Sequence, residues 1–237
     1  MFRVVTLRPA TGVRFSTNWF HETWHVLTDR AGAFVLARLL WGLSFQRERG
    51  TVVLIDGEHL APTPFEADPP RPILIVPRWL TRADGESLRA LQFRLRKPWP
   101  SKTIRFHTFG LASEAPIDTR HWKEPSRRRD DASESVEVRS AFICWSAPAV
   151  VMRERARYIY AMRHCKKMDY HYLAETGFRA EGEVQVFRDF ETMISAARLA
   201  RRAVLGDPKR AIQDYPERAA IYAEAERASL RLRTARG

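Results

Sequence analysis

TVVLID, residues 51–56, is the stretch that decides the fold. An uninterrupted run of apolar, β-branched residues is typical of a strand buried on both faces of a sheet. Residues 2–8 predict a short edge strand. Further strands are expected at 73–76, 103–109, 136–145 and 184–187.

Helical patterns fill the intervals between these runs. We expect helices after Asp84, after Ser146 and from Asp189 to Leu205, where Gly206 ends the last of them. Short strands that alternate with longer helices favour an α/β fold. We therefore predict a mainly parallel, doubly wound three-layer sheet. A mixed sheet is the alternative, because residues 73–109 could contain an antiparallel pair.

The two ends of the chain extend this core with helices. Ser16, Thr17 and Asn18 offer caps for a helix that reaches Asp29, and an apolar helix follows at 31–47, so an N-terminal helical pair is expected. At the other end, 211–237 predicts a weakly packed C-terminal helical extension. Residues 1–210 then form a single α/β domain, in which the charge-dense segment 112–135 is a mobile insertion.

The composition indicates a globular protein of a reducing compartment. The chain has 237 residues, of which 45% are hydrophobic, enough for a sizeable core. Its two cysteines, Cys144 and Cys165, indicate no disulfide framework. We see no signal peptide, and the longest apolar stretch, 33–45, is too short to cross a bilayer. The expected location is the cytoplasm.

The formal net charge of +12 points to an anionic partner. Nucleic acid, an acidic protein and a membrane surface all satisfy this condition. The alternative is a general arginine bias that raises the charge without any binding site.

His21-Glu22-Thr23-Trp24-His25 fits the pattern HExxH. On a helix the two histidines share one face and can hold zinc, while Glu22 acts as general base on a zinc-bound water. In these five residues the chain resembles the zincin metallopeptidases, which implies a zinc-dependent hydrolase. The alternative is an ordinary polar face, with His21 and His25 opposite a core stripe.

A second pattern lies on the helix expected after Ser146. Basic and aromatic side chains recur there at helical spacing with few acids among them, as phosphate binding requires. These residues are Arg153, Arg157, Tyr160, His164 and Lys167, and Arg198, Arg201 and Arg202 would extend the surface. The alternative is a solvated face that is merely rich in arginine.

Other motifs are weaker or missing. Asp56 ends a strand, where some nucleases hold a metal; the NYN/PIN-type nucleases have a similar strand ending. The chain has no GxxxxGK[ST], GxGxxG or GxSxG motif. The leading hypothesis is a basic nucleic-acid-binding or accessory protein. A zinc hydrolase and a non-catalytic interaction scaffold are the alternatives.

Overall fold

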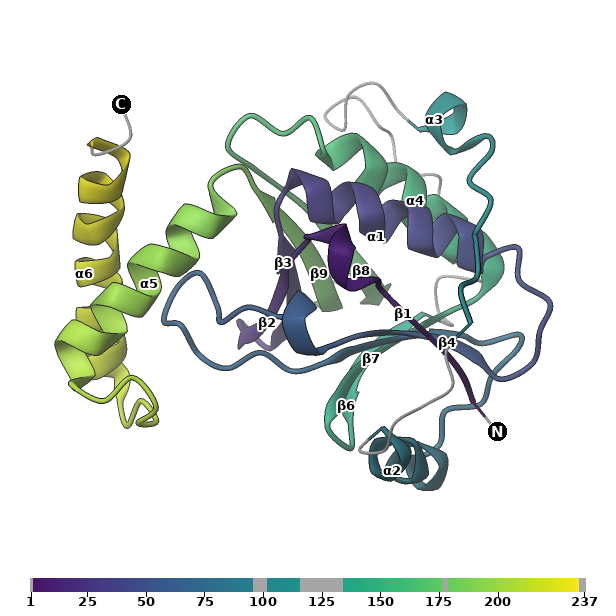
Figure 1. Cartoon of the computed structure of the whole chain (residues 1–237), viewed down its shortest axis with the longest axis horizontal. Helices are drawn as coiled ribbons and strands as arrows, with labels where there is room; N and C mark the ends of the chain where they lie inside the picture. The colour runs from purple at the N-terminus through teal and green to yellow at the C-terminus, as the bar shows by residue number, and fades with distance from the viewer. Residues whose placement is uncertain (1, 96–101, 116–133, 177–178, 235–237) are drawn as a thin grey trace.

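A computed structural model describes residues 2–95, 102–115, 134–176 and 179–234. Within them the chain is a mixed α/β protein with two sheets (Figure 1). Most of the segment expected to be a mobile insertion, 116–133, lies outside the described residues. Its described flanks are structured: α3 spans Leu111–Glu114, and Glu134 is buried.

The first sheet has five strands in the order β1-β4-β5-β7-β6. Their bounds are β1 Arg3–Thr6, β4 Thr51–Ile55, β5 Ile73–Pro77, β6 Ser135–Arg139 and β7 Phe142–Ala147. β1 runs parallel to β4 and β5 runs parallel to β7, but β4/β5 and β6/β7 are antiparallel. The expected strand at 136–145 is thus a hairpin, which turns at Ser140 with φ 56°. We call this sheet A.

The second sheet, sheet B, has the order β2-β3-β9-β8. Its strands are β2 Phe15–Phe20, β3 Thr23–Thr28, β8 Met168–Thr176 and β9 Arg179–Phe187. β3 and β9 are parallel, and each is antiparallel to its outer neighbour. The prediction of a mainly parallel sheet is therefore not confirmed, since both sheets are mixed.

Helices cover the sheets on more than one side. α1 (Arg30–Leu43) and α4 (Ala149–Met162) lie side by side, and their buried residues share one core with both sheets (Figure 1). α2 (Gly85–Arg94) packs on the other face of sheet A, where Leu88 and Leu91 are buried. α5 (Phe190–Leu205) and α6 (Tyr215–Thr234) pair with each other and extend away from the sheets.

Two further expectations are wrong. The first member of the N-terminal helical pair is the β2–β3 hairpin, whose aromatic and β-branched residues suit strands. The expected strand at 103–109 has no regular structure at its described residues. The C-terminal extension is helical as predicted, and its Ile221 and Ala228 are buried. No described helix has the length and apolar character needed to cross a membrane.

Candidate functional site

The HETWH motif forms a β-turn and the start of a strand. His21 and Glu22 connect β2 to β3 and have φ values of 51° and 60°. Two successive positive φ values in a two-residue connection are those of a type I′ hairpin turn. The prediction that the motif is helical is wrong, so the geometric reason for placing zinc between His21 and His25 is lost. Among the described residues, no group of three or more potential metal ligands comes together.

His25 lies instead in a row of polar residues that crosses sheet B. The register pairs Asn18 with His25, His25 with Glu183 and Glu183 with Tyr172. His25 Nδ1 lies 2.9 Å from Asn18 Oδ1, so we assign the ring proton to Nδ1. His25 Nε2 then carries a lone pair, and it lies 3.5 Å from Glu183 Oε2.

Burial sets the protonation of this pair. Burial, and to a smaller extent nearby His21, lowers the pKa of His25 to about 4. Burial also raises the pKa of Glu183, against a hydrogen bond from Gln185 that lowers it. The ion pair that the distance alone would permit is therefore disfavoured at neutral pH. Burial thus opposes charge on both members of the pair.

The arginines of α4 are less available than the sequence predicts. The Arg153 guanidinium lies 5.2 Å from the centre of the Phe45 ring, and Arg157 Nε donates to the Glu114 carbonyl oxygen at 2.7 Å. The Tyr160 ring has two neighbours, because the centre of the Phe34 ring lies 5.6 Å and the Arg163 guanidinium 3.6 Å from its centre. Arg153, Arg157 and Tyr160 are half-buried and partly engaged by neighbouring elements, and their role in binding stays a prediction.

The remaining predicted basic residues are divided between other places. α4 ends at Met162, so His164 and Lys167 lie in the exposed connection before β8. Arg198 and Arg202 are exposed on α5. Arg201 is buried: it pairs with Asp68 Oδ1 at 2.6 Å and donates to the carbonyl oxygens of Glu66, Pro208 and Arg210. Arg201 therefore has a structural role.

A buried network that sequence reasoning missed surrounds Glu134. Its carboxylate accepts hydrogen bonds from Trp145 Nε1 at 2.9 Å, from Arg155 Nη2 at 2.8 Å and from the Ala174 backbone N–H at 2.7 Å. Arg155 Nη1 also donates to His171 Nε2 at 3.0 Å, which requires a neutral ring. Burial and the nearby Arg155 charge accordingly lower the pKa of His171. The network joins α4, β7 and β8.

The outer face of sheet B is the surface turned away from α1 and α4. Along the edge strand β8, the side chains of Met168, Tyr170 and Tyr172 are 50%, 50% and 42% exposed. Alternate residues of a strand share a face, and on the opposite face His171 and Leu173 are buried while Asp169 is partly buried. The rings of Tyr170 and Tyr172 lie 5.4 Å apart. The sequence signal was the alternation MDYHYL, which fits a strand with one exposed aromatic face.

Three exposed basic residues lie where this exposed row ends. Lys166 and Lys167 precede Met168, and Arg188 follows β9. The Arg188 N–H donates to the Lys167 carbonyl oxygen at 2.9 Å, so the two segments are still neighbours there. We call Met168, Tyr170, Tyr172, Lys166, Lys167 and Arg188 the β8 surface.

Acids also lie close to the β8 surface, because Asp169 stands between Met168 and Tyr170, and Asp189 follows Arg188. The Asp169 side chain accepts a hydrogen bond from the Tyr170 N–H at 2.9 Å. Burial, followed by the charges of Glu183 and Glu175, raises the pKa of Tyr172, so its hydroxyl stays protonated at neutral pH.

Asp56, the other candidate metal ligand, stands at the end of β4. Burial raises its pKa, and the positive field of His59 opposes this shift. His59 is itself buried and places Nδ1 3.2 Å from the Val13 carbonyl oxygen. Comparisons of the chain with protein-family models, with curated proteins and with solved structures found no match.

Proposed function

We propose that this protein binds single-stranded nucleic acid, and that the β8 surface is the contact. The observation that carries the proposal is the exposed row of Met168, Tyr170 and Tyr172, which ends beside three basic residues. The net charge of +12 supports an anionic partner of this kind. Of the basic residues predicted for binding, Lys167 belongs to this surface and His164 lies close to it in the chain.

The spacing of the tyrosines suits unpaired bases. Residues two apart on one strand are about 6.7 Å apart, close to the span of one extended nucleotide. A tyrosine ring can stack on any base, and such stacking contributes roughly 1–3 kcal/mol per base. Paired bases are already stacked within a duplex, so the same rings should favour single strands. Lys166, Lys167 and Arg188 would meet the phosphates that follow the stacked bases.

The test is binding of a fluorescein-labelled oligouridylate or oligodeoxythymidylate of about 15 nucleotides, followed by fluorescence anisotropy. Tyr170→Ala and Tyr172→Ala should each weaken binding by about tenfold on single strands and much less on duplex. Lys167→Glu combined with Arg188→Glu should also flatten the dependence of log affinity on log salt, by about 0.7 for each phosphate that is no longer neutralised.

The matched control is Arg47→Glu combined with Arg89→Glu, which removes the same charge from exposed positions outside the β8 surface and outside the basic residues predicted for binding. Equal weakening by this control would show that net charge, and not the β8 surface, governs binding. Absence of salt-dependent binding by the unaltered protein would contradict the proposal. A further outcome is that a polyacidic protein binds, and that Tyr170→Ala and Tyr172→Ala do not change oligonucleotide binding. This result would favour an acidic protein partner and the scaffold hypothesis.

A further inference from the structure

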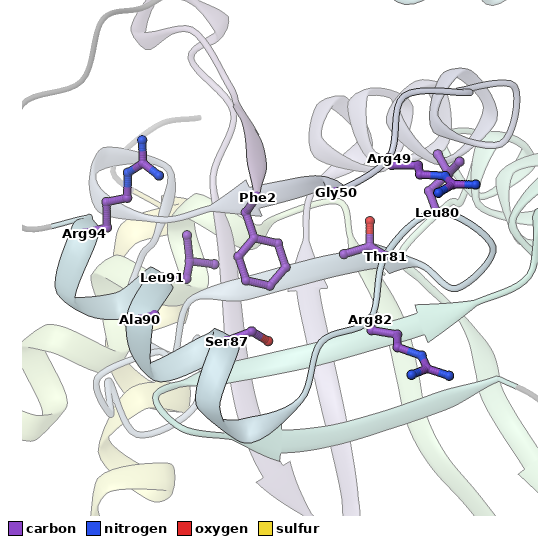
Figure 2. A pocket seen from close by; sticks show the side chains of 10 residues that line it. All are labelled: Phe2, Arg49, Gly50, Leu80, Thr81, Arg82, Ser87, Ala90, Leu91 and Arg94. Atoms are coloured by element: carbon purple, nitrogen blue, oxygen red, sulfur yellow. The ribbon is translucent and has the colours of Figure 1, made fainter.

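A cavity of about 440 Å³ lies on the side of sheet A that α2 covers. Its lining residues come from positions 2–94, whereas the β8 surface is formed by residues 166–188. Its walls come from the start of the chain at Phe2, from Arg49–Gly50, from Leu80–Arg82 and from α2 (Figure 2). This volume falls in the range of small-molecule sites, about 300–1,000 Å³.

The floor of the cavity is apolar and is held by the backbone. Phe2, Leu80 and Leu91 line it, and Leu91 is buried in the core beneath α2. The Arg3 N–H donates to the Gly50 carbonyl oxygen at 2.8 Å, and the Gly50 N–H donates to that of Leu80 at 3.1 Å. These bonds tie together three segments of the wall, so the cavity is formed before any ligand arrives.

The polar part of the lining is cationic. Three guanidinium groups, those of Arg49, Arg82 and Arg94, stand around the apolar floor, and no acidic residue of the described chain lines the cavity. Figure 2 shows Arg49 and Arg82 on one side of the Phe2 ring and Arg94 on the other. Arginine remains charged at every physiological pH and binds carboxylate and phosphate groups through paired hydrogen bonds.

Nearby acids have other partners. Glu48 pairs with Arg3. Asp84 caps α2 by accepting from the Ser87 N–H at 2.8 Å, and this bond, more than the charge of Arg82, lowers its pKa. The lining therefore offers positive charge beside apolar surface, with these neighbouring acids held elsewhere.

We propose that this cavity binds a small organic anion, in which an aromatic or acyl body rests on Phe2, Leu80 and Leu91. Its carboxylate or phosphate monoester group meets Arg82 and Arg49. Arg94 adds positive charge at the opposite end. The site is independent of the proposed nucleic-acid surface.

The experiment uses the full chain and three probes: 1-naphthyl phosphate, 1-naphthoate and the neutral 1-naphthylmethanol. Isothermal titration should show saturable binding of the two anions, and the neutral probe should bind at least about tenfold more weakly, because it forms no charged hydrogen bond. Inorganic phosphate alone should also bind more weakly than 1-naphthyl phosphate, since it leaves the apolar floor uncovered. Comparison of the first two probes distinguishes a phosphate from a carboxylate ligand.

Variants place the binding in the cavity. Arg82→Gln should weaken binding of the preferred anion by about tenfold. Ala90→Phe, which adds a ring to the lining, should abolish binding while leaving the circular dichroism spectrum unchanged. Arg89→Gln is the matched control, because Arg89 is exposed on α2 but does not line the cavity. Unchanged affinity in both Arg82→Gln and Ala90→Phe, equal loss in Arg89→Gln, or equal affinity for the neutral probe would overturn the proposal.

Discussion

Arg155 and Glu134 form a buried ion pair, in which Nη2 lies 2.8 Å from Oε2, across 21 positions of the chain. The same carboxylate accepts from Trp145 on β7 and from Ala174 on β8. These donors replace the hydrogen bonds that water would make to the carboxylate, which offsets the cost of its burial. The pair therefore fixes where α4 sits relative to both sheets.

Removing one member of this pair should be strongly destabilising. Glu134→Ala leaves the Arg155 guanidinium buried without its carboxylate, so the free energy of unfolding should fall by about 3–5 kcal/mol. Urea denaturation followed by tryptophan fluorescence measures the change. Glu134→Leu combined with Arg155→Met should recover part of the loss, because no unpaired charge remains, although the Trp145 and Ala174 N–H groups still lack their acceptor. A loss below about 1 kcal/mol in the single variant would mean that the pair is not buried as described.

The contact of β9 with β6 at Gly182 leaves no room for a methyl group. A Cβ at Gly182 on β9 would lie 2.7 Å from Val136 Cγ2 on β6. We expect Gly182→Ala to lower the unfolding free energy by about 1–3 kcal/mol through overpacking, as measured by urea denaturation. Val136→Ala should relieve this effect in the double variant. Simple additivity of the two substitutions would show that they do not meet.

Two substitutions in the β2–β3 turn should make the folded protein more stable. His21 and Glu22 adopt positive φ values, which Asn and Gly tolerate better. His21→Asn with Glu22→Gly should raise the melting temperature, with a gain of about 1 kcal/mol in unfolding free energy. This variant also removes the exposed Glu22–Arg179 ion pair, at 3.7 Å, which contributes little stability. A helical HETWH segment would instead be destabilised by the introduced glycine.

Acid should destabilise the protein through His25. Its folded pKa is about 4, below the value of 6.5 for an exposed histidine. As pH falls from about 6.5 to 4, the unfolded chain takes up a proton that the folded chain refuses, so stability falls by up to about 3 kcal/mol. His25→Gln should flatten this part of the profile. The raised pKa of Glu183 acts in the opposite direction, so that stability falls as pH rises through its folded value.

Equilibrium unfolding at closely spaced pH values separates these contributions. The pKa of buried His171 is also lowered. The unfolding free energy of His25→Gln should therefore still fall somewhat as the pH is lowered. An unaltered pH profile in His25→Gln would show that His25 is protonated in the folded protein as readily as in the unfolded one.

Local signals predicted individual elements well. Thr51–Ile55 and Ile73–Pro77 are strands because their apolar runs are unbroken, and α2 begins after Asp84, whose side chain caps it. α5 ends at Gly206 as predicted. Strand direction was less accessible, because β4 and β5 pair antiparallel through contacts that no local pattern encodes.

The site residues were harder to predict. A spacing of four places two residues on one face of a helix, but it does so on a strand as well, so His21 and His25 did not distinguish the two. The helix after Ser146 was expected to continue to Lys167, but it ends at Met162. The strand that begins at Met168 was therefore not predicted. Glu134 gave no signal because its partners are gathered from three elements by the tertiary fold.

The parallel pairing of β3 with β9 has a consequence for synthesis of the chain. His25 pairs with Glu183, and most of the chain lies between them. The β2–β3 hairpin is therefore synthesised well before β9, the strand that pairs with β3 inside the sheet. Until then Val26 and Leu27 lack the part of their native cover that β9 and α5 provide. Closing so long a loop is slow. During translation the unpaired edge of β3 is therefore exposed until β9 is made, which is the kind of surface that chaperones protect.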